Sequence, residues 1–149
     1  MIPLRFNLIA LLLLALLSVG LGSHAFAEET PLPVAVLNRT VTVDFNTEIK
    51  PFLSKNCFAC HNETKAKAGL ILETPAAILK GGENGPVVEP GKAETSLQFA
   101  SAAHLDDPPM PPANNKSNAV DLNPDQLALL KLWIDQGAKG TGQNARPAP

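Results

Sequence analysis

Apolar residues recur at helical spacing in several short segments of this 149-residue chain. The first segment places Phe45, Ile49 and Phe52 on one side of a helix. Asp44 or Asn46 can cap its start, because a short polar side chain accepts hydrogen bonds from the first free amides of a helix. The pattern predicts a helix that ends near the first of two cysteines.

Two further short helices are predicted in the middle of the chain. Thr74 precedes Pro75, a pairing that favours a helix start, and the apolar residues that follow end at Gly81. The next helix is expected to begin with Thr95 or Ser96 as its cap and to have only a weak apolar stripe. The glycines and prolines between these two helices predict a loop.

The last helix has the clearest end signals. Asn123 can act as N-cap, Pro124 suits the first helical position, and Gln126 can reach back to complete a capping box. Gly137 supplies the left-handed residue that ends many helices. We therefore predict a helix over residues 124–136. Its apolar face consists of Leu127, Leu130, Trp133 and Ile134.

Strand signals are weak throughout the chain, so these segments predict an all-α fold of about four short helices joined by long loops. Long loops in a compact domain usually need something central to organise them. The predicted core comprises Phe45, Ile49, Phe52, Leu53, Leu70, Leu72, Leu97, Phe99, Leu127, Leu130, Trp133 and Ile134.

Both ends of the chain differ in composition from the middle. Arg5, an apolar run and the small residues Ala25 and Ala27 predict a signal peptide over residues 1–27, cleaved after Ala27. The protein is then expected in the periplasm or otherwise exported. A retained anchor is the competing interpretation, but the run is shorter than the roughly 20 apolar residues that span a bilayer.

The remaining chain divides into three parts. Residues 28–43 read as an N-terminal tail, residues 44–138 as one domain, and residues 139–149 as a disordered C-terminal tail. Loss of Arg5 with the leader leaves 11 basic and 14 acidic residues, a formal charge of −3 without a basic cluster. This balance argues against a nucleic-acid partner. A domain this small often needs a cofactor or a covalent staple to stay folded.

The only two cysteines, Cys57 and Cys60, are followed directly by His61. This C-x-x-C-H spacing is the attachment signature of c-type haem, with two thioether bonds and a histidine beneath the iron. A disulfide or a redox-active cysteine pair is the simpler interpretation of two exported thiols. A zinc site that also uses His104 is a further alternative, although the paired ligand spacing of structural zinc sites is missing.

A haem at this motif raises the question of the sixth iron ligand. Met110 is the only methionine beyond the leader, and four neighbouring prolines stiffen its loop. Coordination by histidine and methionine raises the reduction potential and leaves no open position for a substrate, which favours electron transfer. His104 is the rival ligand, and an open sixth position is the third option.

Several motifs together resemble one known family, the planctomycete-type cytochrome c domain, a branch of the class I cytochrome c fold. They are VDFNTEIKPFLSKNCFACHN, KAGLILET, GGENGPVVEPGKAETSLQ, MPP and LNPDQLALLKLWIDQGA, in that order. The resemblance implies one covalent haem c, with Cys57 and Cys60 as attachment sites, His61 proximal and Met110 distal. It also implies that the loop from Gly81 to Gly91 lies beside the haem.

One residue departs from the family pattern, because Asn62 stands where glycine usually follows the histidine. Asparagine tolerates the left-handed conformation better than most residues, so we expect the turn to be kept. Members of this family are often modules of larger proteins, whereas this sequence encodes no further domain. We therefore expect it to meet its redox partner as a separate molecule.

The expected function is that of an exported monohaem cytochrome, which carries single electrons between redox protein partners and is not an enzyme. The negative charge suggests a partner with a positive docking patch. One alternative is a haem enzyme or sensor of peroxidase-like type with a weak or open sixth site. Another is a module without haem, held by a disulfide between Cys57 and Cys60. No stable membrane span is expected once the leader is cleaved.

Overall fold

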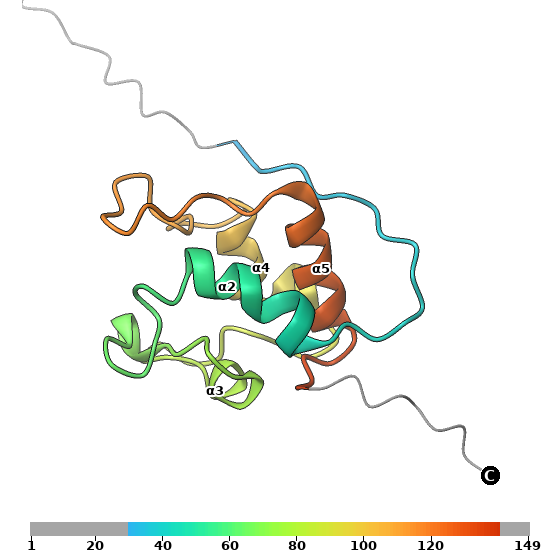
Figure 1. Ribbon diagram of the computed structural model, residues 1–149, viewed down its shortest axis with the longest axis horizontal. Helices are drawn as coiled ribbons and strands as arrows, with labels where there is room; N and C mark the ends of the chain where they lie inside the picture. Colours follow the sequence, from blue (N-terminus) through green and yellow to red (C-terminus); the bar gives the residue numbers. More distant parts are fainter. Residues whose placement is uncertain (1–29, 141–149) are drawn as a thin grey trace, which may run out of the picture.

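The computed structural model describes residues 30–140, and within this range it contains helices and loops but no β-strand. The four α-helices are α2 (Lys50–Asn56), α3 (Pro75–Lys80), α4 (Leu97–Ala102) and α5 (Pro124–Asp135). Two 3₁₀ turns, Lys67–Gly69 and Ala93–Thr95, lie in the connecting loops. The predicted all-α fold with about four short helices is confirmed (Figure 1).

A π-helical turn, Phe45–Ile49, precedes α2 directly. Its N-cap is Asp44, whose side chain accepts a hydrogen bond of 2.9 Å from the amide of Thr47. Pro51 then falls in the first turn of α2, where its missing amide hydrogen is not needed. The proline thus marks the change from the π turn to the α-helix, and α2 ends directly before Cys57, as the pattern predicted.

The middle helices differ in how their ends are held. Thr74 caps α3 as predicted, because its hydroxyl accepts a hydrogen bond from the amide of Ala77. Ser96 precedes α4 but does not cap it; its hydroxyl donates instead to the carbonyl of Lys92. The expectation of a side-chain cap on this helix was therefore wrong.

Helix α5 begins with the predicted capping box. The side chain of Asn123 accepts from the amide of Gln126 at 2.9 Å, and the side chain of Gln126 accepts from the amide of Asn123 at 3.0 Å. The helix ends at Asp135, one residue earlier than predicted, and Gly137 adopts the expected positive φ.

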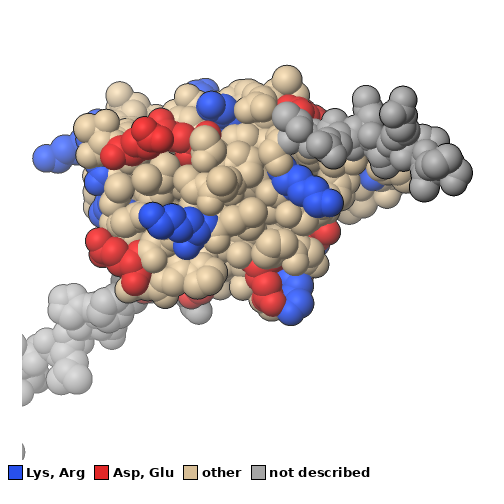
Figure 2. Space-filling view, turned by 90° about the horizontal axis from the view of Figure 1, so that it is seen from below, with Lys and Arg blue, Asp and Glu red and all other residues tan. Residues whose placement is uncertain are grey.

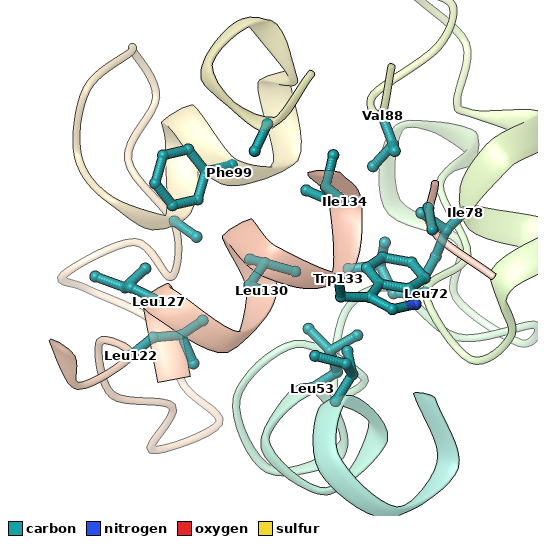
Figure 3. Packing of buried hydrophobic residues seen from close by; sticks show 14 of the residues in the cluster. Leu53, Leu72, Ile78, Val88, Phe99, Leu122, Leu127, Leu130, Trp133 and Ile134 are labelled. Atoms are coloured by element: carbon teal, nitrogen blue, oxygen red, sulfur yellow. The ribbon is translucent and has the colours of Figure 1, made fainter. Parts of the chain in front are cut away.

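The core lies around α5, as Figure 3 shows. The ring of Trp133 packs against Phe45 with centroids 5.4 Å apart, which joins α5 to the π turn. Figure 3 also places Ile78 of α3 and Val88 of the loop that follows near Trp133 and Ile134. The buried residues outside the predicted core include Val43, Ile78, Val87, Val88, Ala93 and Leu122.

The segment before the π turn runs along the domain, seen as the blue trace in Figure 1. The amide of Leu32 donates to the carbonyl of Ala103 at 2.9 Å, and the amide of Ala35 donates to that of Pro124 at 3.1 Å. The predicted signal peptide and most of the predicted C-terminal tail lie outside the described residues. Among residues 30–140, no helix has the length and apolar character needed to cross a membrane.

Candidate functional site

The two cysteines and His61 occupy the turns that follow α2. The amide of Cys57 donates to the carbonyl of Leu53, which continues the helix by one hydrogen bond. The amides of Cys60 and His61 both donate to the carbonyl of Cys57, at 3.1 and 3.0 Å. Both thiols are free, and the backbone fixes them and the imidazole within one compact turn.

A cavity of about 360 Å³ opens beside this turn. Cys57, His61 and Met110 all line it, although Met110 comes from a loop nearly fifty residues further along the chain. Most of the remaining wall is apolar. It includes Leu53, Leu70, Leu72, Pro86, Val87, Leu97, Ala102, Pro108, Leu122 and Leu130.

A second hollow of about 440 Å³ adjoins the first and shares Cys57, His61, Met110 and Pro111 with it. Cys60 lines only this second hollow. The four residues that the sequence singled out for haem therefore line two hollows with a partly shared wall, Cys60 in the second hollow only.

Met110 is fixed to helix α4 by its backbone. Its amide donates to the carbonyl of Ser101 at 2.9 Å. The peptide bonds that precede Pro108 and Pro111 are both cis. This anchoring keeps Met110 on the same cavity wall as Ser101.

His104, the rival ligand, lies elsewhere. It follows α4 with a φ of 56°, and its Nε2 is 3.3 Å from a carboxylate oxygen of Asp121. It lines neither hollow. The described residues contain no group of three or more His, Cys, Asp or Glu side chains placed to hold a metal ion. The zinc interpretation, which needed His104 beside the cysteines, therefore has no support in this structure.

Burial sets the protonation of Cys57 and His61, the two titratable residues that line both hollows. Burial, and to a smaller extent the neighbouring Cys60, raises the pKa of Cys57 to about 12, so this thiol stays protonated at neutral pH. Burial lowers the pKa of His61, partly opposed by the backbone carbonyls of Leu70 and Lys67, which favour the protonated ring by accepting hydrogen bonds from it. The imidazole is therefore neutral at pH 7, the form in which a ring nitrogen can bind a metal.

Asn62 keeps the turn after His61 by a different means from the one predicted. It is not among the residues with positive φ, so the expected left-handed conformation was wrong. Its side-chain oxygen instead accepts from the amides of Thr64 and Lys65, and its amide donates to the carbonyl of Phe58 at 2.6 Å. The side chain, rather than the backbone conformation, organises this turn.

The loop from Gly81 to Gly91 lies along one wall of the main cavity, to which residues 82 and 84–87 contribute. Close backbone contacts require its first two glycines. A Cβ atom on Gly81 would lie 2.3 Å from the carbonyl oxygen of Gly85, and one on Gly82 would lie 2.6 Å from that of Ala68. These contacts fold the loop tightly enough for Pro86 and Val87 to reach the cavity.

The residues present fit a haem. Leu97 was predicted to be core, yet it is 41% exposed and lines the cavity, as a residue would that packs against an apolar ring system. The Nδ1 atom of His61 and both amide atoms of Gln98 are buried without a hydrogen-bond partner. Gln98 lines the same cavity and was not identified from the sequence, because a single glutamine near a helix start has no distinguishing pattern.

Comparisons with known proteins agree with this geometry at one point. Residues 57–114 match the family described as Planctomycete cytochrome C. A solved structure, the hydrazine synthase of Kuenenia stuttgartiensis, is similar at 21% sequence identity with a TM-score of 0.45. That similarity covers 68% of this chain and 16% of the hydrazine synthase chain, so this chain spans a small part of that protein. No curated protein matches.

Proposed function

From the planctomycete cytochrome c family, to which residues 57–114 match, we propose that this haem-binding protein is an exported monohaem cytochrome that carries single electrons between redox proteins. One observation carries the proposal. Two segments far apart in sequence bring Cys57, His61 and Met110 to one mostly apolar cavity, with Cys60 beside it.

Each of these residues has a separate role in the proposal. The thiols of Cys57 and Cys60 would hold the haem through two thioether bonds, and the neutral imidazole of His61 would bind its iron. Met110, held on α4 through its backbone, would supply the second iron ligand of the protein. When bound, haem supplies an iron that changes between the ferrous and ferric states. A haem held by both His61 and Met110 would have no iron site free for a substrate, which would separate an electron carrier from an enzyme.

The apolar wall has its own part in the proposal. Leu70, Leu72 and Leu97 exclude water from the iron, and a low local dielectric tunes the reduction potential. Covalent attachment of this kind is made outside the bacterial cytoplasm, which agrees with export by the leader over residues 1–27. We take residues 44–138 as the functional domain.

The side chains around the thiol pair favour an acidic docking patch on the partner. Lys65, Lys67 and Lys116 line the second hollow, all three are exposed, and its lining includes no Asp or Glu. Charges interact over roughly 8–10 Å in physiological salt, so lysines that line the hollow act on a partner docked there more strongly than charges farther away do. Figure 2 shows basic and acidic residues interspersed over the face it displays, so the net charge is not concentrated there.

Reversing the charge of single lysines tests whether the partner's docking patch is acidic. Lys67→Glu or Lys116→Glu should slow oxidation of the ferrous protein by ferricyanide, an anion, and should weaken the effect of salt on that rate. Lys80→Glu makes the same change in net charge on α3, at a residue that lines neither hollow, and serves as control. An equal effect of all three substitutions would mean that the net charge of the protein sets the rate. The partner would then be expected to have a basic docking patch.

The electron-carrier proposal is tested by spectroscopy of the protein made with haem-attachment machinery. Its mass should include one haem, and the oxidised form should show the far-red band of a sulfur–iron bond. Met110→Ala should abolish that band and lower the potential, whereas His104→Ala should leave both unchanged. Rapid binding of CO or cyanide to the wild type would instead indicate an open iron and a peroxidase-like enzyme. A colourless protein would leave the disulfide-held module as the remaining interpretation.

A further inference from the structure

The amide of Gln98 is an unusual group to find in this cavity. Its Nε2 and Oε1 atoms are both buried, and neither has a hydrogen-bond partner. Leaving a buried polar group unpaired costs about 1–3 kcal/mol, so proteins rarely do so without a reason. The backbone of Gln98 is well fixed, because its amide donates to the carbonyl of Val87 at 2.8 Å. The side chain therefore lies in the cavity because the fold holds it there.

The position of Gln98 relative to the cysteines matters for a haem. The two vinyl groups that form thioether bonds lie on one edge of the porphyrin, and the two propionates lie on the opposite edge. Cys60 lines the second hollow but not the main cavity, whereas Gln98 lines the main cavity but not the second hollow. A porphyrin attached through Cys57 and Cys60 would then have its propionate edge on the side of the main cavity, which Gln98 lines.

The main cavity offers few other partners for a carboxylate. No Lys or Arg is among its lining residues, and its one carboxylate, that of the exposed Asp107, would repel a propionate. Asn84 also lines it, but it is exposed and can hydrogen bond to water. Ser101 also lines it and is buried, but its hydroxyl is not among the buried atoms that lack a hydrogen-bond partner, whereas both amide atoms of Gln98 are. Gln98 is thus the lining residue whose buried donor is left unpaired.

We propose that the side-chain amide of Gln98 donates a hydrogen bond from Nε2 to a haem propionate and so positions the acidic edge of the cofactor. This inference rests on the haem of the proposed function and assigns Gln98 as a further cofactor-binding residue. Such a hydrogen bond to a charged acceptor is stronger than one between neutral groups. It also offsets part of the propionate charge near the iron.

Two substitutions of Gln98 test the assignment in the haem-loaded protein. Gln98→Leu removes the donor, and Gln98→Glu replaces it with an acceptor of the same shape. Gln98→Glu keeps the side-chain shape and so still tests the assignment if Gln98→Leu does not fold. Resonance Raman spectroscopy reports the propionate bending vibration, whose frequency depends on hydrogen bonding to the carboxylate. Both variants should shift this band and lower the midpoint potential, Gln98→Glu by more, because it adds a negative charge. The sulfur–iron band should stay unchanged.

Asn84→Leu is the matched control, since it removes an exposed amide from the same cavity. It should leave the propionate band in place; a shift in this variant with none in those of Gln98 would assign the contact to Asn84 and overturn the proposal. An altered melting temperature without a change in the propionate band would make Gln98 a packing residue and overturn it as well. A wild-type protein without attached haem would refute the proposed function itself, whereas haem in all variants with an unchanged band refutes only the role of Gln98.

Discussion

Gly81 offers the sharpest test of how the cavity wall is built. It follows α3 with φ 79° and ψ −165°, a combination open to almost no residue except glycine. A Cβ atom there would lie 2.3 Å from the carbonyl oxygen of Gly85 and 2.8 Å from the Cα of Pro86. Both neighbours are backbone atoms of the wall loop, so they cannot move aside without displacing the residues that line the cavity.

The cost of Gly81→Ala follows from these two terms. The backbone conformation costs about 1–3 kcal/mol for a residue with a side chain. Crowding against a packed backbone adds about 1–3 kcal/mol. Gly91 also has a positive φ, of 84°, but nothing lies within 4 Å of its added Cβ, so Gly91→Ala should cost only about 1–2 kcal/mol. The difference between the two variants isolates the contact with the loop.

The assay is urea unfolding of the haem-loaded protein, followed by the fluorescence of Trp133, the only tryptophan. Gly81→Ala should be less stable than Gly91→Ala, and the sulfur–iron band should weaken as the wall loop shifts. Gly82→Ala isolates the steric part, because Gly82 lacks a positive φ and its added Cβ would lie 2.6 Å from the carbonyl oxygen of Ala68. If Gly81→Ala and Gly82→Ala were both as stable as Gly91→Ala, the close packing of this loop would be refuted.

Three further substitutions probe separate features by the same assay. Asn62→Gly should lower stability by about 1–2 kcal/mol even though glycine is usual at this position in the family, because the side chain's hydrogen bonds to Thr64, Lys65 and Phe58 are lost; a gain in stability would show that backbone freedom matters more. Arg39→Met should remove the ion pair that lowers the pKa of Glu48 in the folded state. A carboxyl group with a lowered folded-state pKa stabilises the fold at pH values above its usual pKa, and this stabilisation is lost as the pH falls through the folded-state pKa. The variant should therefore be less stable than wild type at pH 7, by at most about 1 kcal/mol, and equally stable in acid. A difference that persisted at low pH would mean that Arg39 acts by packing. Asn123→Ala should cost about 0.5–2 kcal/mol through loss of the capping box of α5, and Ser117→Ala, which alters a loop side chain, is its comparison; equal losses would contradict a specific capping effect.

Helix ends could be predicted where local side chains decide them. Asn123, Gln126 and Gly137 act within one or two turns, and the structure has the capping box and the positive φ that they predicted. Ser96 shows the limit of this reasoning, because its hydroxyl found a partner in the carbonyl of Lys92 rather than in the helix that follows. A short polar side chain can satisfy several backbone groups, and only the path of the preceding loop selects among them.

The cavity could be predicted only in part. The spacing of Cys57, Cys60 and His61 is local and can therefore be recognised in the sequence. Met110 was a candidate because it is the only methionine after the leader. Gln98 was missed, since its place in the cavity depends on the orientation of α4. That orientation is fixed by a distant contact, the hydrogen bond from the amide of Gln98 to the carbonyl of Val87. Nonlocal packing of this kind leaves no pattern in a single sequence.

The structure also separates two layers that the sequence merged into one predicted core. Phe45, Phe99, Trp133 and Ile134 are buried in the core cluster around α5 and do not line the cavity. Of the predicted core, Leu53, Leu70, Leu72, Leu97 and Leu130 do line it. Leu53 and Leu130 are buried by the protein as well, so they form the boundary between the layers, whereas Leu70 and Leu97 retain exposed surface.

The two sets of residues therefore contribute to stability in different ways. The helices around Trp133 bury apolar surface against protein, and burial of this kind stabilises the fold with or without a cofactor. Leu70 and Leu97 leave surface that a bound porphyrin would cover, so their contribution depends on haem. The stability of the wall loops should therefore depend on haem more than that of the α5 core does. The core residues are buried by protein alone, whereas the loop residues are fully buried only when the cofactor is bound.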